Sequence, residues 1–524
     1  MLIRLNNIFQ ASSRYLSDDL WRKFERLDPA DLPEALKEHS LAKGDAAFLP
    51  DMARVELYRH RLRNSTPGTS PKNLDTYQVN PTLALLEVNW RSLLACLDDP
   101  TVAPEPGEDR LLFWRDPRTG FCHEASASAP DLLALKIVVE KLAPEIVAEQ
   151  GGTPVGTIDA VLAAAVDKGL LMAPASRLQR IPPKFPAPAP VPEPYRTATV
   201  FTLQWHITHR CDLHCRHCYD RTLRRDVDFE QGLEALDQMR SFCRTHHVRG
   251  QVSFSGGNPF LHPDFVPLYR AAHERNLTPA ILGNPVSAAQ LDEVIAIVRP
   301  AFFQVSLEGL QEHNDRIRGH GSFDAVLRFL DLLRSRNVYS MVMLTLTSAN
   351  LDQVLPLAGL LKERANLLTF NRLAMVGEGA NLASPGKDAY HNFVKQLLEA
   401  RKTNPILALK DSLINIELDS RQSPLFGGCT GFGCGAAFNF VSLLPDGEVH
   451  ACRKFPSLIG NLYRDSLDRI YHSDGAEAYR QGCRECDDCR LRAMCGGCLA
   501  VAYGYGLDPL QSKDPGCFLE TSAN

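Results

Sequence analysis

The chain has 524 residues, of which 44% are hydrophobic and 23% charged, and its formal net charge is −5. This composition excludes a disordered or fibrous protein, and the charge disfavours a nucleic-acid or anionic-membrane partner. No apolar run approaches the roughly 18 residues of a membrane span, and the amino terminus lacks a signal-peptide pattern. We therefore expect a cytoplasmic protein of three or four domains.

The first 175 residues predict two small domains. Residues 1–100 are predicted to be mostly helical, with a helix over 51–62 and a loop over 64–70. Residues 109–175 predict a winged-helix domain, because strands at 110–114 and 121–124 flank a turn and three helices follow. The last helix, 157–168, has one apolar face and stops at Gly169. A plain α+β packing domain is the alternative for this segment.

Seven prolines lie between Pro182 and Pro194, which predicts a semi-rigid linker over 179–197. The pattern then changes to alternating strands and helices. Parallel strands with helical crossovers predict an α/β fold, a partial (β/α)6 TIM-like barrel over 198–400, with its chemistry at the carboxyl ends of the strands. The expected strands are 199–207, 251–255, 279–283, 302–307, 340–346 and 367–373.

Cys211, Cys215 and Cys218 follow the first predicted barrel strand at C-x3-C-x2-C spacing. Three thiolates on one loop can hold three irons of a 4Fe–4S cluster and leave the fourth iron open to a small molecule. A zinc site is the alternative, although zinc favours four ligands.

The carboxyl-terminal tail, 401–524, holds nine of the 15 cysteines. In a cytosolic protein, dense cysteine favours metal or redox chemistry over disulfides. A zinc ribbon is the alternative for this tail taken alone. The nine are Cys429, Cys434, Cys452, Cys483, Cys486, Cys489, Cys495, Cys498 and Cys517.

The loop from Cys211 to Tyr219 resembles the cluster loop of the radical S-adenosylmethionine (SAM) enzymes, in which the open iron binds SAM. Residues 255–259 are similar to the Gly-Gly-Glu-Pro element of that family, with Asn258 in place of the glutamate. The resemblance implies that Gly256, Gly257 and Asn258 approach the methionine amino group. It further implies a ribose-contacting pair, a carboxylate-binding arginine and an adenine-packing aromatic, here Ser306, Glu308, Arg318 and Tyr219.

The tail resembles the SPASM extension of radical SAM enzymes, which carries two auxiliary 4Fe–4S clusters. The resemblance implies that Cys429, Cys434, Cys452 and Cys498 hold the first cluster, and that Cys486, Cys489, Cys495 and Cys517 hold the second. Cys483 is left over; it could shift the partition by one cysteine, or act as a transient ligand or substrate contact. The expected cofactors are three 4Fe–4S clusters and SAM.

Together the resemblances imply a radical SAM peptide maturase, and residues 49–54 and 80–86 faintly resemble the selenobiotic-type subgroup of these enzymes. We expect residues 109–175 to bind the leader of a ribosomally made precursor peptide. The expected reaction is an oxidative crosslink, a thioether from sulfur or selenium to carbon, with an electron donor such as flavodoxin or ferredoxin. One alternative is a SPASM oxidase that modifies a protein side chain, as a sulfatase maturase does, and the other is an iron–sulfur electron-transfer protein without turnover.

Overall fold

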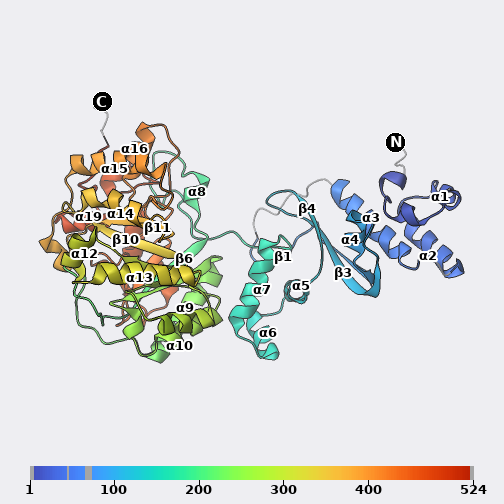
Figure 1. The fold of residues 1–524 in the computed structure, drawn as a ribbon, viewed down its shortest axis with the longest axis horizontal. Coiled ribbons are helices and arrows are strands. Elements are labelled where there is room, and N and C mark those ends of the chain that lie inside the picture. Colours follow the sequence, from blue (N-terminus) through green and yellow to red (C-terminus); the bar gives the residue numbers. More distant parts are fainter. Residues whose placement is uncertain (1–4, 44–45, 65–73, 520–524) are drawn as a thin grey trace. The chain divides into compact units, whose positions relative to one another are not determined.

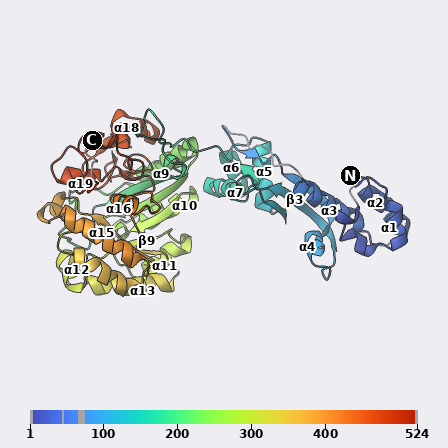
Figure 2. The ribbon, with the colours of Figure 1, turned by 90° about the horizontal axis from the view of Figure 1, so that it is seen from above.

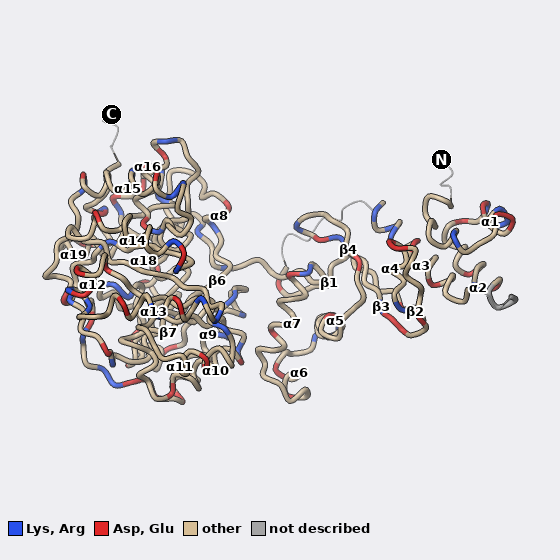
Figure 3. The backbone as a smooth tube through the Cα atoms, in the orientation of Figure 1, with Lys and Arg blue, Asp and Glu red and all other residues tan. Residues whose placement is uncertain are grey.

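The computed structural model describes residues 5–43, 46–64 and 74–519, which divide into two compact units (Figures 1 and 2). Unit 1 comprises Met1–Ala175 and unit 2 comprises Ser176–Asn524. Lys and Arg are interspersed with Asp and Glu along both units, in keeping with the small net charge (Figure 3). Among the described residues, no helix has the length and apolarity that a membrane crossing requires.

Unit 1 begins with short helices that pack around α3, whose residues Met52 and Val55 are fully buried. The predicted helix over 51–62 is confirmed by α3, and the loop predicted over 64–70 lies, apart from Asn64, outside the described residues. The elements are η1 (Leu5–Asn7), η2 (Ser12–Tyr15), α1 (Asp18–Phe24), α2 (Leu32–Lys43) and α3 (Leu49–Asn64).

The sequence predicts that residues 1–100 are mostly helical, but the structure also contains the strand β2 (Ala84–Arg91) in this segment. This strand pairs antiparallel with β3 (Glu105–Arg115), which pairs with β4 (Cys122–Ser126) in a sheet of order β2-β3-β4. Leu86 and Val88 alternate with exposed residues and point into the core, which is the period-two pattern of a half-buried strand. The short α4 (Leu93–Asp98) joins β2 to β3.

The hairpin and the three helices predicted after residue 109 are present. The helices are α5 (Ala129–Val139), α6 (Pro144–Gly151) and α7 (Val155–Asp167). Ile158 and Leu162 of α7 are buried in the same cluster as Leu112 and Trp114 of β3, so the helices cover one face of the sheet. A two-stranded ladder of β1 (Gln78–Val79) and β5 (Leu171–Met172) completes the unit.

The sequence predicts a semi-rigid linker over residues 179–197, but in the structure this segment packs as part of unit 2. The division between the units falls at residue 175, and Phe185 and Val191 are buried in the core of unit 2. The Arg180 guanidinium stacks over Phe185 and Phe438 and donates to the carbonyl of Cys434. The segment packs because its apolar residues have surface to bury, while prolines have no N–H group that would need a partner.

Unit 2 contains the predicted partial barrel. Its six parallel strands pair in chain order, and helices connect them. All six strand predictions are confirmed within two residues at each end. The strands are β6 (Val200–Thr208), β7 (Arg249–Gly256), β8 (Thr278–Leu282), β9 (Phe303–Ser306), β10 (Ser340–Leu346) and β11 (Leu367–Arg372). The helices are α9 (Phe229–His246), α10 (Phe265–Glu274), α11 (Ala288–Ile297), α12 (Gln311–Arg318), α13 (Ser322–Ser335) and α14 (Val354–Leu361), with η3 (Pro259–Leu261) and η4 (Leu351–Gln353).

The cysteine-rich tail continues the barrel sheet and belongs to the same compact unit. β12 (Phe440–Leu443) pairs parallel with β6, and two antiparallel strands extend the sheet to nine. The remaining elements are η5 (Gly377–Asn381), α8 (Glu193–Arg196), α15 (Lys387–Arg401), α16 (Ile414–Ser420), β13 (Glu448–His450), β14 (Leu458–Asn461), α17 (Leu467–Tyr471), α18 (Asp474–Gln481), η6 (Arg484–Cys486) and α19 (Leu499–Gly504).

Candidate active site and metal centres

The three-cysteine loop leaves the carboxyl end of β6. Its backbone is fixed from outside, since Arg216 N donates to the Ile317 carbonyl and Glu378 N donates to the Cys218 carbonyl. Burial raises the pKa of the Cys215 and Cys218 thiols. Iron binding must therefore displace protons from these thiols, as it does wherever a metal takes thiolate ligands.

Gly256 and Gly257 at the end of β7 pack directly on the backbone that leads into this loop. A Cβ atom on Gly256 would lie 2.0 Å from the Thr208 oxygen, and one on Gly257 would lie 2.1 Å from the Arg210 oxygen. Gly256 also has a φ of +135°, which side chains rarely adopt. The two glycines thus hold the end of β7 against the cluster loop.

A network of polar side chains lies beside the loop and was only partly foreseen. Asp212 Oδ1 accepts from Asn258 Nδ2 at 3.3 Å and from Asn284 Nδ2 at 2.6 Å. Asn284 Oδ1 accepts from Arg318 Nη2 at 2.9 Å. Asn258 and Asn284 follow the ends of β7 and β8, as expected for chemistry at the carboxyl edge of a parallel sheet, and Arg318 is the last residue of helix α12. The signal that could have indicated Asn284 is its position two residues after β8.

Glu308 is the buried carboxylate of this network, and only 2% of its surface is exposed. Its carboxylate lies 3.0 Å from His217 Nε2 and 3.5 Å from Arg318 Nη1, and it accepts from Thr345 N at 2.8 Å. Burial acts to raise the pKa of Glu308, but His217, Arg318 and the Thr345 amide outweigh it and lower the pKa below its ordinary value. The ribose contact implied for Glu308 and for Ser306, the last residue of β9, stays a prediction.

Tyr219 connects the cluster loop to the tail. Its hydroxyl lies 3.1 Å from His206 Nε2, and the Arg453 guanidinium stacks over its ring at 5.0 Å. Burial raises the pKa of Tyr219 to about 12. Arg453 directly follows Cys452 and also donates to Ser255 Oγ, so a single side chain joins a tail cysteine to the end of β7. The adenine contact implied for Tyr219 stays a prediction.

The first cysteine set of the tail comes together from three separate segments. Burial raises the pKa of the Cys434 thiol to about 12, and the neighbouring thiolates of the other three members add to that rise. The glycine-rich turn before Cys434 packs on the second cysteine segment, since a Cβ on Gly428 would lie 2.6 Å from the Met494 oxygen. The members are Cys429, Cys434, Cys452 and Cys498.

The second set is grouped in the same way and includes Cys483. The thiolates of Cys483, Cys495 and Cys489 all raise the pKa of Cys486, and Cys517 raises that of Cys495. Cys483 is 2% exposed and hydrogen-bonds Cys486, which lowers the pKa of the Cys483 thiol. Five thiols therefore share this neighbourhood, and both partitions of the tail cysteines remain open.

A buried ion pair ties both sets to the barrel. Arg372, the last residue of β11, donates to Asp514 through both terminal nitrogens and to Asp411 through Nε at 2.8 Å. Asp514 Oδ2 in turn accepts from Cys498 N at 2.8 Å, and its carbonyl accepts from Cys517 N at 2.9 Å. Sequence reasoning missed both residues, because neither belongs to a spacing motif.

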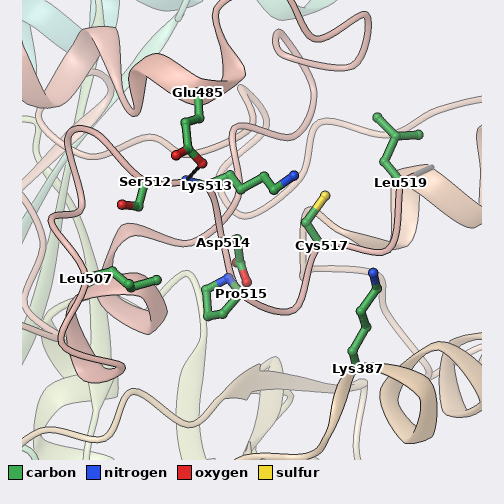
Figure 4. Close-up of a pocket in the computed structure, with 9 residues that line it drawn as sticks. All are labelled: Lys387, Glu485, Leu507, Ser512, Lys513, Asp514, Pro515, Cys517 and Leu519. Atoms are coloured by element: carbon green, nitrogen blue, oxygen red, sulfur yellow. Dashed lines mark hydrogen bonds between the residues drawn. The ribbon is translucent and has the colours of Figure 1, made fainter. Parts of the chain in front are cut away.

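A cavity of about 710 Å³ opens beside the second set, and Figure 4 shows Cys517 in its wall. The exposed residues Lys387 and Lys513 border it, together with Glu485 and Asp514. The thiol of Cys517 is thus closer to solvent than that of Cys495, which is 7% exposed.

These residues fit iron–sulfur clusters and SAM. Thiols are the ligands of such clusters, and they are gathered in one group of three and two larger groups. The group of three lacks a fourth protein thiol in its motif and lies next to an amide, carboxylate and guanidinium network that could bind an amino acid moiety.

Comparison with known proteins agrees with this arrangement. Residues 205–361 match the model of the radical SAM superfamily, and residues 434–498 match that of the SPASM iron-sulfur cluster-binding domain. The mycofactocin maturase MftC of Mycolicibacterium smegmatis is 28% identical over 340 residues, covering 60% of this chain and 82% of its own. The subtilosin biosynthesis protein AlbA of Bacillus subtilis is 23% identical over 311 residues, covering 56% of this chain and 66% of its own.

Two further matches limit what can be inferred about the activity, because one relative has a different named activity and the other match shows only a shared fold. The Fe-coproporphyrin III synthase of Methanosarcina barkeri is 28% identical over 356 residues, covering 60% of this chain and 87% of its own. The solved structure of Streptococcus suis SuiB bound to S-adenosylmethionine has a TM-score of 0.50 and 15% identity, covering 78% of this chain and 96% of its own, and shows a shared fold. The loop after β6 therefore belongs to a radical SAM domain, and the cysteine-rich tail contains a SPASM iron-sulfur cluster-binding domain.

Proposed function

We propose that this chain modifies a ribosomally made precursor peptide, and that unit 1 binds the leader of that peptide. The observation that carries the proposal is the sheet of unit 1, in which the edge strand β4 pairs on one side only among the described strands. An exposed strand edge can accept an extended peptide as an additional strand through main-chain hydrogen bonds.

The hydrogen-bond pattern of the hairpin identifies which amides face that edge. Asp116 N donates to the Phe121 carbonyl, and Ala127 N donates to the Arg110 carbonyl. Antiparallel ladders alternate between hydrogen-bonded and non-bonded pairs, so the inward amides of β4 fall on every second residue between these two bonds. The amides that point away from β3 are then those of Cys122, Glu124 and Ser126.

Unit 1 is what separates peptide maturation from other radical chemistry. The curated relatives include both peptide maturases and a tetrapyrrole synthase, and each match covers 60% of this chain or less. A solved structure of SuiB is bound to its precursor peptide SuiA, and its fold match covers 78% of this chain, more than unit 2 alone spans. A peptide-docking unit joined to the radical unit supports a peptide substrate.

The proposed reaction is a thioether crosslink. Cys211, Cys215 and Cys218 would hold the cluster whose open iron binds SAM. One electron from a carrier would cleave SAM into methionine and a 5′-deoxyadenosyl radical, which would take a hydrogen atom from a carbon of the peptide and leave as 5′-deoxyadenosine. A cysteine sulfur of the peptide would then bond to that carbon, its proton would go to solvent, and the thiols of the tail would hold the auxiliary cluster that takes up the remaining electron. The peptide therefore loses two hydrogens and one free thiol in each turnover.

The cavity beside Cys517 supports an electron entry point for a carrier such as flavodoxin or ferredoxin. Lys387 and Lys513 at its rim suit the acidic surface of such a carrier, and complementary charge mainly raises the association rate. The variant Lys387→Glu/Lys513→Glu should slow reduction by flavodoxin about tenfold at low salt. Reduction by dithionite should be unchanged, as should both rates in the control Lys402→Glu. Equal slowing with dithionite would place the defect in the clusters instead.

The test of unit 1 uses the full-length, reconstituted enzyme and a precursor peptide encoded beside its gene. Ser126→Pro removes an edge amide and no β3–β4 backbone hydrogen bond, so leader affinity should fall about tenfold. It also removes the hydrogen bond from Ser126 Oγ to Asp109, which the control Ser126→Ala removes as well. Ser126→Ala keeps the amide and should bind like the parent. Peptide-independent formation of 5′-deoxyadenosine and the thermal melting curve should be unchanged in both variants.

Two outcomes would contradict the proposal. Equal leader affinity in Ser126→Pro and Ser126→Ala would exclude strand addition at β4. A peptide product of unchanged mass would point to epimerisation, and a loss of two hydrogens with every thiol retained would favour a carbon–carbon bond or an oxidation.

A further inference from the structure

We propose that Asp212 supplies the negative charge that binds the amino group of SAM, in place of the carboxylate that the resembling family carries at the position of Asn258. The inference concerns the cofactor site of unit 2 and holds whatever peptide the enzyme modifies. It assigns a charge-bearing contact to a residue in the cluster loop itself.

Asn258 cannot carry that charge. Its side chain is a neutral amide and the residue is 3% exposed. Its Oδ1 accepts from the backbone amide of Phe260, and its Nδ2 donates to Asp212. Both ends of the Asn258 amide are thus engaged by the protein, and the donor end is directed at a carboxylate.

Asp212 is placed so that its carboxylate supplies the negative charge that Asn258 lacks. It follows Cys211 directly, and Oδ1 is held by Asn258 from the end of β7 and by Asn284 from the end of β8. Asn284 Nδ2 also lies 3.6 Å from Cys211 Sγ. Two amides therefore fix the carboxylate beside a cluster thiol, at the meeting point of three strand ends.

The close packing of Gly257 on Cys211 explains why a carboxylate at position 212 can replace one at position 258. A Cβ on Gly257 would lie 2.7 Å from the Cys211 Cβ, so the residues that follow, Asn258 and Asp212, stand on adjoining backbones. A carboxylate on either backbone would therefore lie close to Cys211.

Asp212 also lacks the cation that every competing carboxylate nearby has. None of the ion pairs among the described residues includes Asp212, and its Oδ2 accepts no hydrogen bond from them. Glu308 is held by His217 and Arg318, Asp220 by Arg224, and Asp226 by Arg210. Asp212 is exposed, so its free oxygen remains available to a ligand amino group, which donates a hydrogen bond that the charge of the carboxylate strengthens.

Equilibrium dialysis on the reconstituted full-length protein tests this with two ligands, S-adenosylhomocysteine and its desamino analogue. Asp212→Asn should weaken binding of the amino-bearing ligand about 10- to 100-fold and that of the desamino analogue less than about threefold. The exposed carboxylate of Glu312 gives the matched control Glu312→Gln, which should bind both ligands like the parent.

A second variant tests the exchange of charge. Asn258→Glu in the Asp212→Asn background should recover most of the lost affinity for the amino-bearing ligand. The electron paramagnetic resonance signal and iron content should match the parent; if Asp212→Asn loses its cluster, Asp212→Ser replaces it in the same comparison. Equal weakening of both ligands, or no recovery by Asn258→Glu, would overturn the proposal.

Discussion

The cysteine thiols of the cluster loop and those of the tail are brought together in opposite ways. Cys211, Cys215 and Cys218 lie within eight residues on one loop, and Cys211 is exposed. The tail thiols are drawn from residues 429–517 and are held by glycine-rich turns, a buried ion pair and one another. The loop is local and incomplete, whereas the tail sets are distant in sequence and enclosed.

This contrast matches two different tasks. A set with a missing ligand can bind a reactive small molecule, while a set closed by protein thiols can accept and pass electrons. The positions of the tail thiols also depend on the fold, since these thiols stay together only while the surrounding structure is intact. Four experiments test the two halves of the comparison.

Removing the open set should have the largest effect. In the variant with alanine at Cys211, Cys215 and Cys218, SAM cleavage should be abolished, because no other thiols are placed to hold an iron with a free site. About two thirds of the iron should remain if three 4Fe–4S clusters are present. Iron analysis and an assay for 5′-deoxyadenosine measure both quantities. Cleavage that persists would mean that a tail set is the reactive centre.

Breaking the buried ion pair should damage the tail and the fold together. Arg372→Met leaves Asp411 and Asp514 buried without their cation, which typically costs about 3–5 kcal/mol of unfolding free energy. Denaturant unfolding and iron content should both fall. Arg336→Met breaks the exposed pair with Asp292 and should change the unfolding free energy by no more than about 1 kcal/mol. Equal effects of the two variants would show that Arg372 does not anchor the tail.

Cys483 and Cys486 should differ in their importance. Cys486→Ser should lose one cluster, about four irons, because Cys486 hydrogen-bonds Cys483 and its pKa is raised by Cys489 and Cys495, which places it among the second-set thiols. Cys483→Ser should retain all three clusters. If the two variants exchange these outcomes, the second cluster uses Cys483, and the partition implied by the family resemblance is shifted by one cysteine.

The smallest effect concerns pH. Burial raises the pKa of Cys434 to about 12 and that of Cys498 to about 11, so both thiols stay protonated at neutral pH in the iron-free protein. Since the thiolate is the reactive form, alkylation of these two thiols should quicken about tenfold per pH unit from pH 7 to 10. Peptide mapping after iodoacetamide treatment measures the rates. A plateau near pH 9, as in the urea-unfolded chain, would contradict the burial.

Elements with a strong local pattern were predictable. The barrel strands and helix α7 follow from apolar periodicity, and the spacings of the cysteines are enough to indicate metal centres. The proline-rich segment misled because composition describes an isolated chain, whereas Phe185 and Val191 are buried in the core of unit 2, where the guanidinium of the sequence-distant Arg492 lies over the Phe185 ring. The strand β2 was not predicted, although buried and exposed residues alternate along it, because the helical patterns nearby in residues 1–100 are stronger.

The sequence by itself determined the chemistry of this protein, because ligand type and spacing on a single loop decide which metals and small molecules can bind there. Only the tertiary structure decided which residues serve that chemistry from a distance. Asn284, Arg372 and Asp514 belong to no spacing motif, and Asp212 is only a spacer residue within one. Their contacts exist because parallel strands end at one edge and because a buried charge must find a partner.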